Sequence, residues 1–159
     1  MKDVHTEHCC IFHGCKYGND DCTVTTKRAS QSFRCETCEY AGIDIRPWGS
    51  YQVLVDEPTH KVKTITVKHH KRLSLQRHQK RAEVWTCVSG SLRVGLGKEL
   101  SSVNYFTIYP GQSVHIAIGD IHRAEAVGSG DATFIEVQTG TYFGEDDIER
   151  FEDDFGRTS

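Results

Sequence analysis

The chain has 159 residues and a formal net charge of −3 at neutral pH, with 37% hydrophobic and 26% charged residues. A globular domain of about 100–150 residues with a small appendage fits this length and composition. No apolar run approaches the roughly 20 residues of a membrane-spanning helix, and the start, MKDVHTEHCC, has no apolar signal region. Because basic residues are not in excess, we expect no nucleic-acid partner. Because the sequence shows neither a spanning run nor a signal region, we expect no membrane partner and a cytoplasmic location.

The cysteines divide the chain into two segments. Six of the seven lie within residues 9–38, so we expect a Cys/His-rich segment at 1–42 and a separate domain at 43–159. The first segment has little apolar periodicity and is too short to bury a core of its own. It therefore needs a covalent or metal staple, or a neighbour to dock on.

Zinc is the staple that we favour in a reducing compartment, where thiolates bind metal more readily than they form disulfides. The chain offers one C-x2-C pair, Cys35 and Cys38, with further cysteines upstream. The predicted ligands are this pair and two of Cys10, Cys15 and Cys22. Disulfides and unligated thiols remain open as alternatives.

From residue 43 onward the sequence changes to short stretches rich in Val, Ile, Thr and aromatic residues, separated by Gly, Asp and Ser. This spacing predicts an all-β sandwich or barrel. Strands are expected within residues 51–55, 61–67, 72–78, 83–90, 91–97, 105–111, 113–120, 122–130 and 132–140. Only the tail EDDIERFEDDFGR, at 145–157, indicates a helical turn.

Polar side chains interrupt two of these strands. Gln76 and His78 are two residues apart and therefore share a face, and a hairpin at QKRA would bring Glu83 back beside His78. His122 follows the turn AIGD further along the chain. Each residue alone has an ordinary explanation, as a core histidine, a surface acid or amide, or a turn cap. A metal ion would satisfy all four buried polar groups at once.

The spacing Gln76-x-His78-x4-Glu83, followed by AIGDIH, resembles the two metal motifs of the cupin barrel. More narrowly, five blocks resemble the type II phosphomannose isomerase (mannose-6-phosphate isomerase) domain. They are RPWGSY, KVKTITV, RLSLQRHQKRAEVWTCVSG, AIGDIHR and IEVQTGTYFGEDDIERFEDDFGR, which together run in order through residues 46–157. The resemblance implies a double-stranded β-helix, or jelly-roll barrel, with a metal site.

Three positions depart from this family's pattern. His69-His70 stands where the family usually has Pro-Gly, Val84 where it has His, and Ala117 where it has Pro. By strand parity Val84 faces away from Glu83, so no ligand is lost. The Cys-rich segment is not part of the family's domain. That domain often follows a mannose-1-phosphate guanylyltransferase domain, and this chain is too short to hold both.

The glutamine among the expected ligands bears on the chemistry. An amide oxygen in place of an imidazole makes the site harder and less suited to redox iron, which favours a Lewis-acid metal. Zinc is the first expectation, with Mn, Co or Ni as alternatives. The resemblance implies a metal-dependent interconversion of mannose 6-phosphate and fructose 6-phosphate through an enediolate, in a pathway to GDP-mannose and surface polysaccharides.

Such an isomerase needs an acid–base group and cations for the phosphate. Glu136 is the candidate base if its strand turns that face inward, and Arg81, two residues before Glu83, is the preferred cation. Lys63 is a further catalytic candidate, followed by Arg157. We assign Trp48 to packing.

Two other functions remain open. The domain could be a cupin isomerase or epimerase that acts on another sugar phosphate, or a non-catalytic, metal-bound module that binds carbohydrate. A substrate profile separates the first alternative from the isomerase, and turnover separates the second. Cupins of this kind usually pair through their outer sheet, so the resemblance also implies a homodimer.

Overall fold

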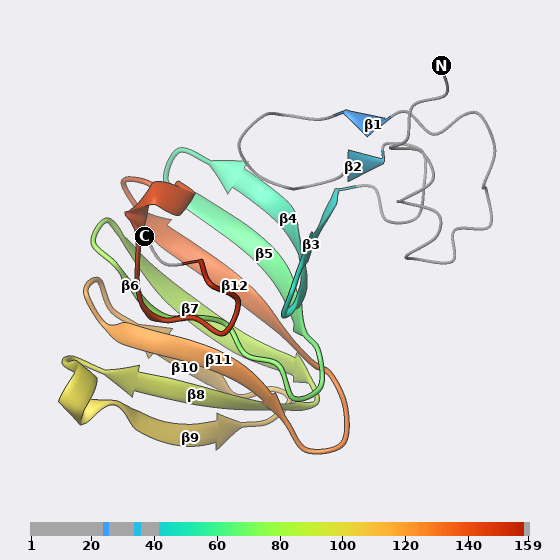
Figure 1. Ribbon diagram of the computed structural model, residues 1–159. Coiled ribbons are helices and arrows are strands. Elements are labelled where there is room, and N and C mark those ends of the chain that lie inside the picture. The colour runs from blue at the N-terminus through green and yellow to red at the C-terminus, as the bar shows by residue number, and fades with distance from the viewer. Residues whose placement is uncertain (1–23, 26–33, 36–41, 158–159) are drawn as a thin grey trace. The chain divides into compact units, whose positions relative to one another are not determined.

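The structure is a computed structural model that describes residues 42–157 in full (Figure 1). Before them it describes only the backbone of β1 (Val24–Thr25) and β2 (Arg34–Cys35), which pair antiparallel. The chain separates into two compact units, Met1–Ile45 and Arg46–Ser159, and β3 (Ile43–Arg46) crosses that boundary.

The predicted zinc ligands of the first segment lie outside the described residues. This holds for Cys10, Cys15, Cys22 and Cys38, and for the side chain of Cys35, whose backbone lies in β2. The N-terminal zinc site therefore stays a prediction.

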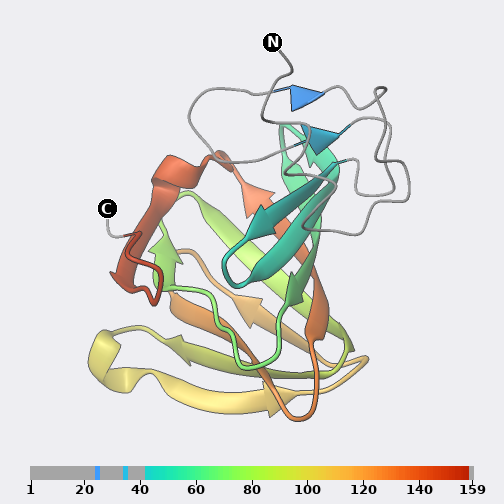
Figure 2. The same cartoon turned by 45° about the vertical axis from the view of Figure 1, so that its right-hand side comes forward.

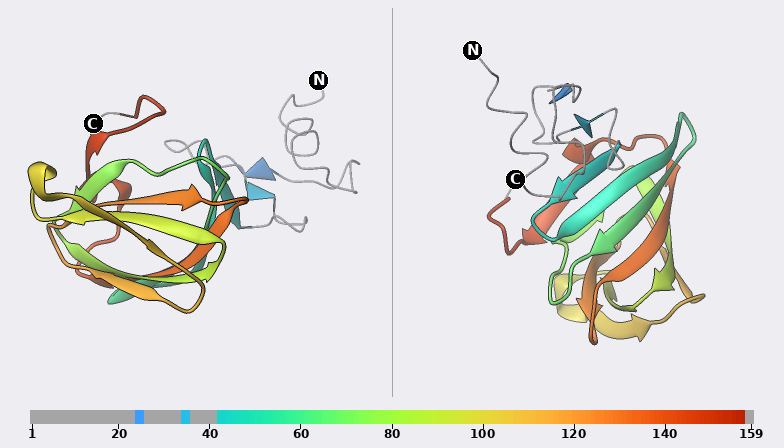
Figure 3. Two further views of the ribbon diagram at one scale, coloured as in Figure 1. Left: turned by 90° about the horizontal axis from the view of Figure 1, so that it is seen from below. Right: turned by 90° about the vertical axis from the view of Figure 1, so that its right-hand side faces the viewer.

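The second unit is built from two antiparallel sheets. One has the order β10 (Ser113–Ile116), β7 (Arg81–Ser89), β12 (Ala132–Gly140), β5 (His60–Val67) and β4 (Gly49–Glu57). The other has the order β13 (Ile148–Glu152), β6 (Leu75–His78), β11 (Ile121–Val127), β8 (Ser91–Gly97) and β9 (Asn104–Ile108). Figures 2 and 3 show the two sheets facing each other around a shared interior, which confirms the predicted jelly-roll barrel.

Each of the nine predicted strand regions contains a strand, although the region at 72–78 is extended only over Leu75–His78. The tail has the predicted helical turn, η2 (Glu145–Asp147), but then continues as β13. A second turn, η1 (Leu100–Ser102), contradicts the expectation that only the tail is helical. No helix within the described ranges could span a bilayer.

The interior is polar at one end and apolar at the other. Alternate residues of β7 are buried, namely Arg81, Glu83, Trp85 and Cys87, and so are alternate residues of β12, namely Ala132, Phe134, Glu136 and Gln138. The two strands pair antiparallel, with Gln138 opposite Glu83 and Phe134 opposite Cys87. The polar halves of both strands therefore lie side by side and form one polar chamber.

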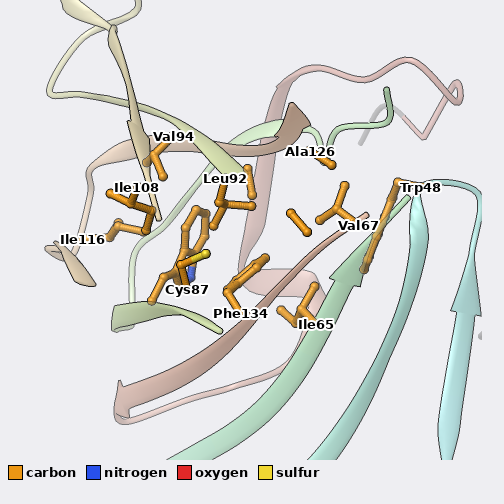
Figure 4. Close-up of a cluster of buried hydrophobic side chains, with 13 residues drawn as sticks. Trp48, Ile65, Val67, Cys87, Leu92, Val94, Ile108, Ile116, Ala126 and Phe134 are labelled. Carbon is orange, nitrogen blue, oxygen red and sulfur yellow. The ribbon is translucent and has the colours of Figure 1, made fainter. Parts of the chain in front are cut away.

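The apolar half forms the hydrophobic core (Figure 4). Side chains of both sheets meet there, among them Leu92, Phe134 and Ile65. Trp48 is 6% exposed and belongs to the same cluster, which confirms its packing role. A core of this kind fixes the spacing of the sheets and hence the positions of the polar groups above it.

The last described segment, residues 144–157, lies along β6 and is called the C-terminal strap here. Its strand β13 pairs with β6, with Ile148 opposite His78 and Arg150 opposite Gln76. Arginines of the barrel reach its acids through the ion pairs Arg72–Asp154, Arg77–Glu149 and Arg123–Glu152. The strap therefore forms one edge of the second sheet beside the expected ligands.

Candidate active site

Three buried side chains meet in the polar chamber. His78, Glu83 and His122 each offer a ligand atom, and these atoms all lie within 4.8 Å of one another. Their side chains are 1–2% exposed. They come from three strands, β6, β7 and β11, so tertiary structure rather than local sequence brings them together.

The hairpin expected between His78 and Glu83 is absent from the described fold, because β6 and β7 belong to different sheets. The chain instead crosses from one sheet to the other at Gln79 and Lys80, and the two side chains meet across the interior. His78 Nε2 lies 3.2 Å from Glu83 Oε1. His122 enters from β11, where it pairs directly with Gln76 of β6.

Backbone carbonyls orient both histidines. His122 Nδ1 lies 2.9 Å from the carbonyl oxygen of Asp120, and His78 Nδ1 lies 3.5 Å from that of Asp147. A carbonyl only accepts, so the short contact fixes the proton of His122 on Nδ1, and its Nε2 presents a lone pair to the cluster. This is the arrangement that metal-binding histidines adopt.

The surroundings of His122 show whether a cation would fit between these side chains. Its Nε2 atom is buried and has no hydrogen-bond partner among the residues that the structure describes, and it lies 3.7 Å from Glu83 Oε2. Burial lowers the pKa of His122 to about 4, so the ring is neutral near pH 7. A buried lone pair beside a carboxylate is costly unless something positive fills the space, and a divalent cation fits that description.

Gln76 is the fourth expected ligand and lines the same cavity as His78 and Glu83. Its Oε1 atom accepts a hydrogen bond of 2.7 Å from the Ser74 hydroxyl. Two imidazole nitrogens, a carboxylate and an amide oxygen form a donor set that suits Zn²⁺, Mn²⁺, Co²⁺ or Ni²⁺.

Glu136 faces inward and shares two hydrogen-bond donors with Glu83. The indole N–H of Trp85 donates to both carboxylates, at 3.0 Å to Glu83 and 3.1 Å to Glu136. The amide nitrogen of Gln138 also donates to both, at 3.0 Å and 2.9 Å. Trp85 and Gln138 were not singled out from the sequence, although their positions two residues from Glu83 and Glu136 place them on the same inward faces.

The two carboxyl groups have opposite electrostatics. Burial raises the pKa of Glu83, but the hydrogen bond and charge of His78, with the charges of His122 and Arg81, outweigh it and hold the value well below the ordinary range. Burial and the charge of Glu83 raise the pKa of Glu136 to about 8. Two neighbouring carboxyls that titrate far apart suit one ionised and one proton-carrying group.

Arg81 points toward the cluster, as its parity predicted, and is 3% exposed. Its Nε donates to Glu83 Oε1 at 3.3 Å, and its Nη1 donates to the Gly144 carbonyl at 3.0 Å. Nη2 lies 3.4 Å from His78 Nε2, and Asp147 is 3.7 Å away. Protein groups therefore surround this guanidinium on every side.

A cavity of about 100 Å³ opens above these residues. Its walls include Lys63 and Arg157, the two other cations expected from the sequence. They also include Arg46 and Arg150, which the sequence did not single out. Arg150 was missed because the tail was expected to form a helical turn rather than a paired strand.

The departures from the family pattern have structural counterparts. Val84 is 37% exposed while Glu83 beside it is buried, so the substituted position does face away from the site. His70, which stands where the family usually has glycine, has a φ of 58°. The turn thus keeps a left-handed backbone that favours glycine.

Residues 36–153 match the family model described as "Mannose-6-phosphate isomerase C-terminal". The chain belongs to this family. The match covers the chamber residues of β6, β7, β11 and β12, whereas Arg157 of the cavity wall lies beyond it. It includes all four expected ligands, Glu136 and Arg150.

The curated relatives are bacterial proteins, and two of those described next are named for polysaccharide biosynthesis. The chain is 44% identical to the alginate biosynthesis protein AlgA of Pseudomonas putida over 133 aligned residues, and this alignment covers 84% of the chain and 26% of AlgA. It is 45% identical over 113 residues to the xanthan biosynthesis protein XanB of Xanthomonas campestris, which covers 71% and 23%. It is also 39% identical over 112 residues to the mannose-1-phosphate guanylyltransferase ManC of Salmonella typhimurium, which covers 70% and 22%. The chain spans about a quarter of the length of these relatives.

Solved structures agree on the fold. The capsular polysaccharide assembling protein CapF of Staphylococcus aureus matches with a TM-score of 0.62 at 18% identity, over 70% of this chain and 34% of that one. The oxalate decarboxylase of Bacillus subtilis matches with a TM-score of 0.61 at 18% identity, over 69% and 29%. Both are cupins, so the predicted cupin fold is confirmed. Identities this low carry the fold alone.

Proposed function

We propose that the domain is a metal-dependent aldose–ketose isomerase that interconverts mannose 6-phosphate and fructose 6-phosphate through an enediolate. One observation carries the proposal: the buried group of His78, Glu83 and His122, whose ligand atoms lie within 4.8 Å of one another in a chain of this family. A structural domain without catalysis has no need of a buried, unpaired imidazole nitrogen such as His122 Nε2 beside a buried carboxylate.

The metal ligands in this proposal are Gln76, His78, Glu83 and His122. When bound, a divalent cation, with zinc preferred over Mn, Co or Ni, would stabilise negative charge on neighbouring substrate oxygens. The carbonyl of Asp120 holds the His122 ring in the required tautomer, and that of Asp147 lies beside Nδ1 of His78. Three of the four donors, those of His78, Glu83 and His122, are 1–2% exposed.

Glu136 is the proposed acid–base group. It lines the cavity beside Glu83, and the donors on Trp85 and Gln138 fix its orientation. We assign it the proton that leaves C2 of the aldose and returns to C1 of the ketose. Lys63, 3.6 Å from Glu136 Oε1, would keep the carboxylate form accessible. Arg81 would hold Glu83 and His78 in place.

Formation of fructose 6-phosphate from mannose 6-phosphate tests the proposal. The purified chain is stripped of metal and reloaded in turn with Zn²⁺, Mn²⁺, Co²⁺ and Ni²⁺. We expect metal-dependent turnover that His78→Ala and His122→Ala both abolish. His115→Ala is the matched control, because His115 is exposed on β10. Folded, metal-loaded protein without turnover would contradict the proposal and redirect the search to other sugar phosphates or to a binding role.

The cytoplasmic location and the homodimer are also proposals. The outward residues of β7 include Val84 and Val88, which are 37% and 51% exposed, and a second copy could cover them. Sedimentation equilibrium of the wild type and of Val88→Lys tests this pairing. A monomeric wild type would rule it out.

The zinc-bound segment at 1–42, separate from a domain at 43–159, is a further proposal. Metal analysis of the purified chain should find a second equivalent of zinc. The double substitution Cys35→Ser/Cys38→Ser should remove that equivalent alone and leave the isomerase metal bound. Retention of all the zinc in this variant would contradict the assignment.

A further inference from the structure

The cavity is more positive than the chain as a whole. Five cationic side chains line it, from Arg46, Lys63, Arg81, Arg150 and Arg157, against three carboxylates, from Glu83, Glu136 and Glu145. The whole chain, in contrast, has a net charge of −3. A cleft lined by one sign of charge concentrates ligands of the opposite sign.

Arg150 is the cation whose surroundings call for an additional partner. Its side chain is 16% exposed, and its nearest acid, Glu145, lies 3.9 Å away. Its Nε atom is buried and, within the part of the chain that the structure describes, donates no hydrogen bond. Arginine stays charged when buried, so an unpaired N–H on a buried guanidinium calls for an acceptor from a ligand.

Other guanidinium groups lie close to Arg150. Burial, then the positive charges of Arg157 and Arg46, lower the pKa of Arg150. Arg157 belongs to the strap, whereas Arg46 ends β3 and donates at 3.0 Å to the hydroxyl of Tyr51, which lies in β4 of the other sheet. Like charges held together in a cavity repel one another, and an anion between them removes that repulsion.

Arg81, which the sequence suggested as the phosphate anchor, is less suitable. Its Nε and Nη1 already donate to Glu83 and Gly144. It is also only 3% exposed. An incoming phosphate would have to displace these partners.

We propose that Arg150, together with Arg46, Lys63 and Arg157, forms an anion subsite that binds the phosphate group of a small phosphorylated sugar. This inference rests on the proposed isomerase function, because it assigns the part of the substrate that does not react. Arginine presents a planar fork of N–H groups that matches phosphate oxygens. Arg157 already pairs with Asp153 and Lys63 with Glu136, so Arg150, whose Nε has no acceptor among the described residues, is the principal phosphate ligand of the subsite.

Strand register places this subsite next to the expected metal ligands. Arg150 lies directly opposite Gln76, and Ile148 of the same strand lies opposite His78. Facing residues on paired strands have Cβ atoms about 4.5–5.5 Å apart. A phosphate on Arg150 would therefore leave the sugar chain to run toward His78 and Glu83, which selects short phosphorylated sugars over longer nucleotide sugars.

Isothermal titration of the metal-loaded full chain tests the subsite, with mannose 6-phosphate, mannose and inorganic phosphate as probes. We expect mannose 6-phosphate to bind at least tenfold more tightly than mannose, and inorganic phosphate to compete with it. Arg150→Gln should weaken binding of mannose 6-phosphate at least tenfold and leave binding of mannose unchanged. Arg150→Lys should recover part of the loss.

Arg77→Gln is the matched control, because Arg77 lies in β6 and pairs with Glu149 of the strap at the surface. It removes the same charge and one strap contact without touching the cavity. Arg46→Gln tests the opposite wall, and it decides the question if Arg150→Gln does not fold. Wild-type affinity in Arg150→Gln or in Arg46→Gln, or an equal loss in Arg77→Gln, would overturn the subsite.

Turnover separates this inference from the function on which it rests. Phosphate-dependent binding without conversion of any sugar phosphate would overturn the isomerase and leave the subsite standing. Conversion of mannose 6-phosphate with an unchanged KM in Arg150→Gln would overturn the subsite and leave the isomerase function standing.

Discussion

The ammonium group of Lys63 lies 3.6 Å from the Glu136 carboxylate, and the two residues face each other directly in the ladder between β5 and β12. Both side chains are largely buried, so water screens the pair weakly. Burial and Glu83 raise the pKa of Glu136, whereas Lys63 lowers it, and the balance stands at about 8. Lys63 thus keeps the carboxylate within reach of neutral pH, where an acid–base catalyst is most effective.

The first prediction concerns Glu136→Gln. The side chain keeps its size but can no longer exchange a proton at this position, so kcat for mannose 6-phosphate should fall about 100- to 10,000-fold. Metal content should be unchanged, because Glu136 is not among the proposed ligands. Steady-state kinetics and metal analysis of the same preparation check both points. Glu57→Gln, an exposed carboxylate of β4, should behave as the wild type.

The second prediction concerns the pH dependence of stability in chelator. The folded state binds the Glu136 proton more tightly than the unfolded chain does, since the pKa moves from 4.5 to about 8. Its contribution therefore falls as the pH rises through this range. Burial lowers the pKa of His122 to about 4, so its contribution rises with pH, but only up to about 6.5.

Between pH 6.5 and 8, of these two groups only Glu136 still changes the stability with pH. The free energy of unfolding should therefore fall over this range by on the order of 1–2 kcal/mol. Glu136→Gln should flatten this slope. Urea denaturation at several pH values measures it. An unchanged slope in the variant would assign the effect to another group.

Much of the fold could be predicted from the sequence because alternation along a strand is a local property. The inward row of β7 was readable from Arg81, Glu83 and Trp85 once its strand was recognised. The crossing between β6 and β7 was not readable, since a two-residue connection is equally compatible with a hairpin. Only packing of the whole barrel decides that His78 and Glu83 meet from opposite sheets.

The site was predicted in part for the same reason. The expected ligands were identified by residue type and spacing, and the parity argument placed Arg81 inward but left open which way Glu136 faces. Gln138 and Arg150 were missed. Their roles in the site follow only from their neighbours, Glu83 for Gln138 and Gln76 for Arg150, and the sequence does not show these contacts. Roles that depend on contacts between distant strands have no local signature.

The third prediction uses the departure at His70. This residue is exposed and has a φ of 58°, a conformation that costs a residue with a Cβ atom more than it costs glycine. His70→Gly should raise the free energy of unfolding by about 0.5–1 kcal/mol, even after the loss of its stacking on His69 and the added freedom of the unfolded chain.

His69→Gly is the contrast. The ring of His69 lies 2.9 Å, through Nε2, from the Gly128 carbonyl oxygen, and this contact would be lost without relief of backbone strain. It should therefore lower stability. Chemical denaturation of both variants provides the comparison, and a loss of stability in His70→Gly would show that stacking outweighs strain.

The fourth prediction concerns Arg123, which holds the strap to the barrel. Its side chain is 1% exposed and donates to the Leu73 carbonyl at 3.0 Å, to the Glu152 carboxylate at 2.9 Å and to the Glu152 carbonyl at 3.2 Å. Arg123→Met keeps the buried stem but removes all three donors, so the unfolding free energy should fall by about 2–3 kcal/mol. Arg93→Met, at an exposed arginine of β8, should change it by less than about 0.5 kcal/mol.

The same substitution should also act on the site, because the strap carries Arg150 into the cavity wall. A loosened strap leaves the ligands of β6, β7 and β11 in place but withdraws the phosphate cations. We therefore expect Arg123→Met, below its melting temperature, to raise KM for mannose 6-phosphate at least tenfold while metal content stays the same. An unchanged KM in a destabilised protein would mean that the strap holds the barrel together but does not shape the substrate site.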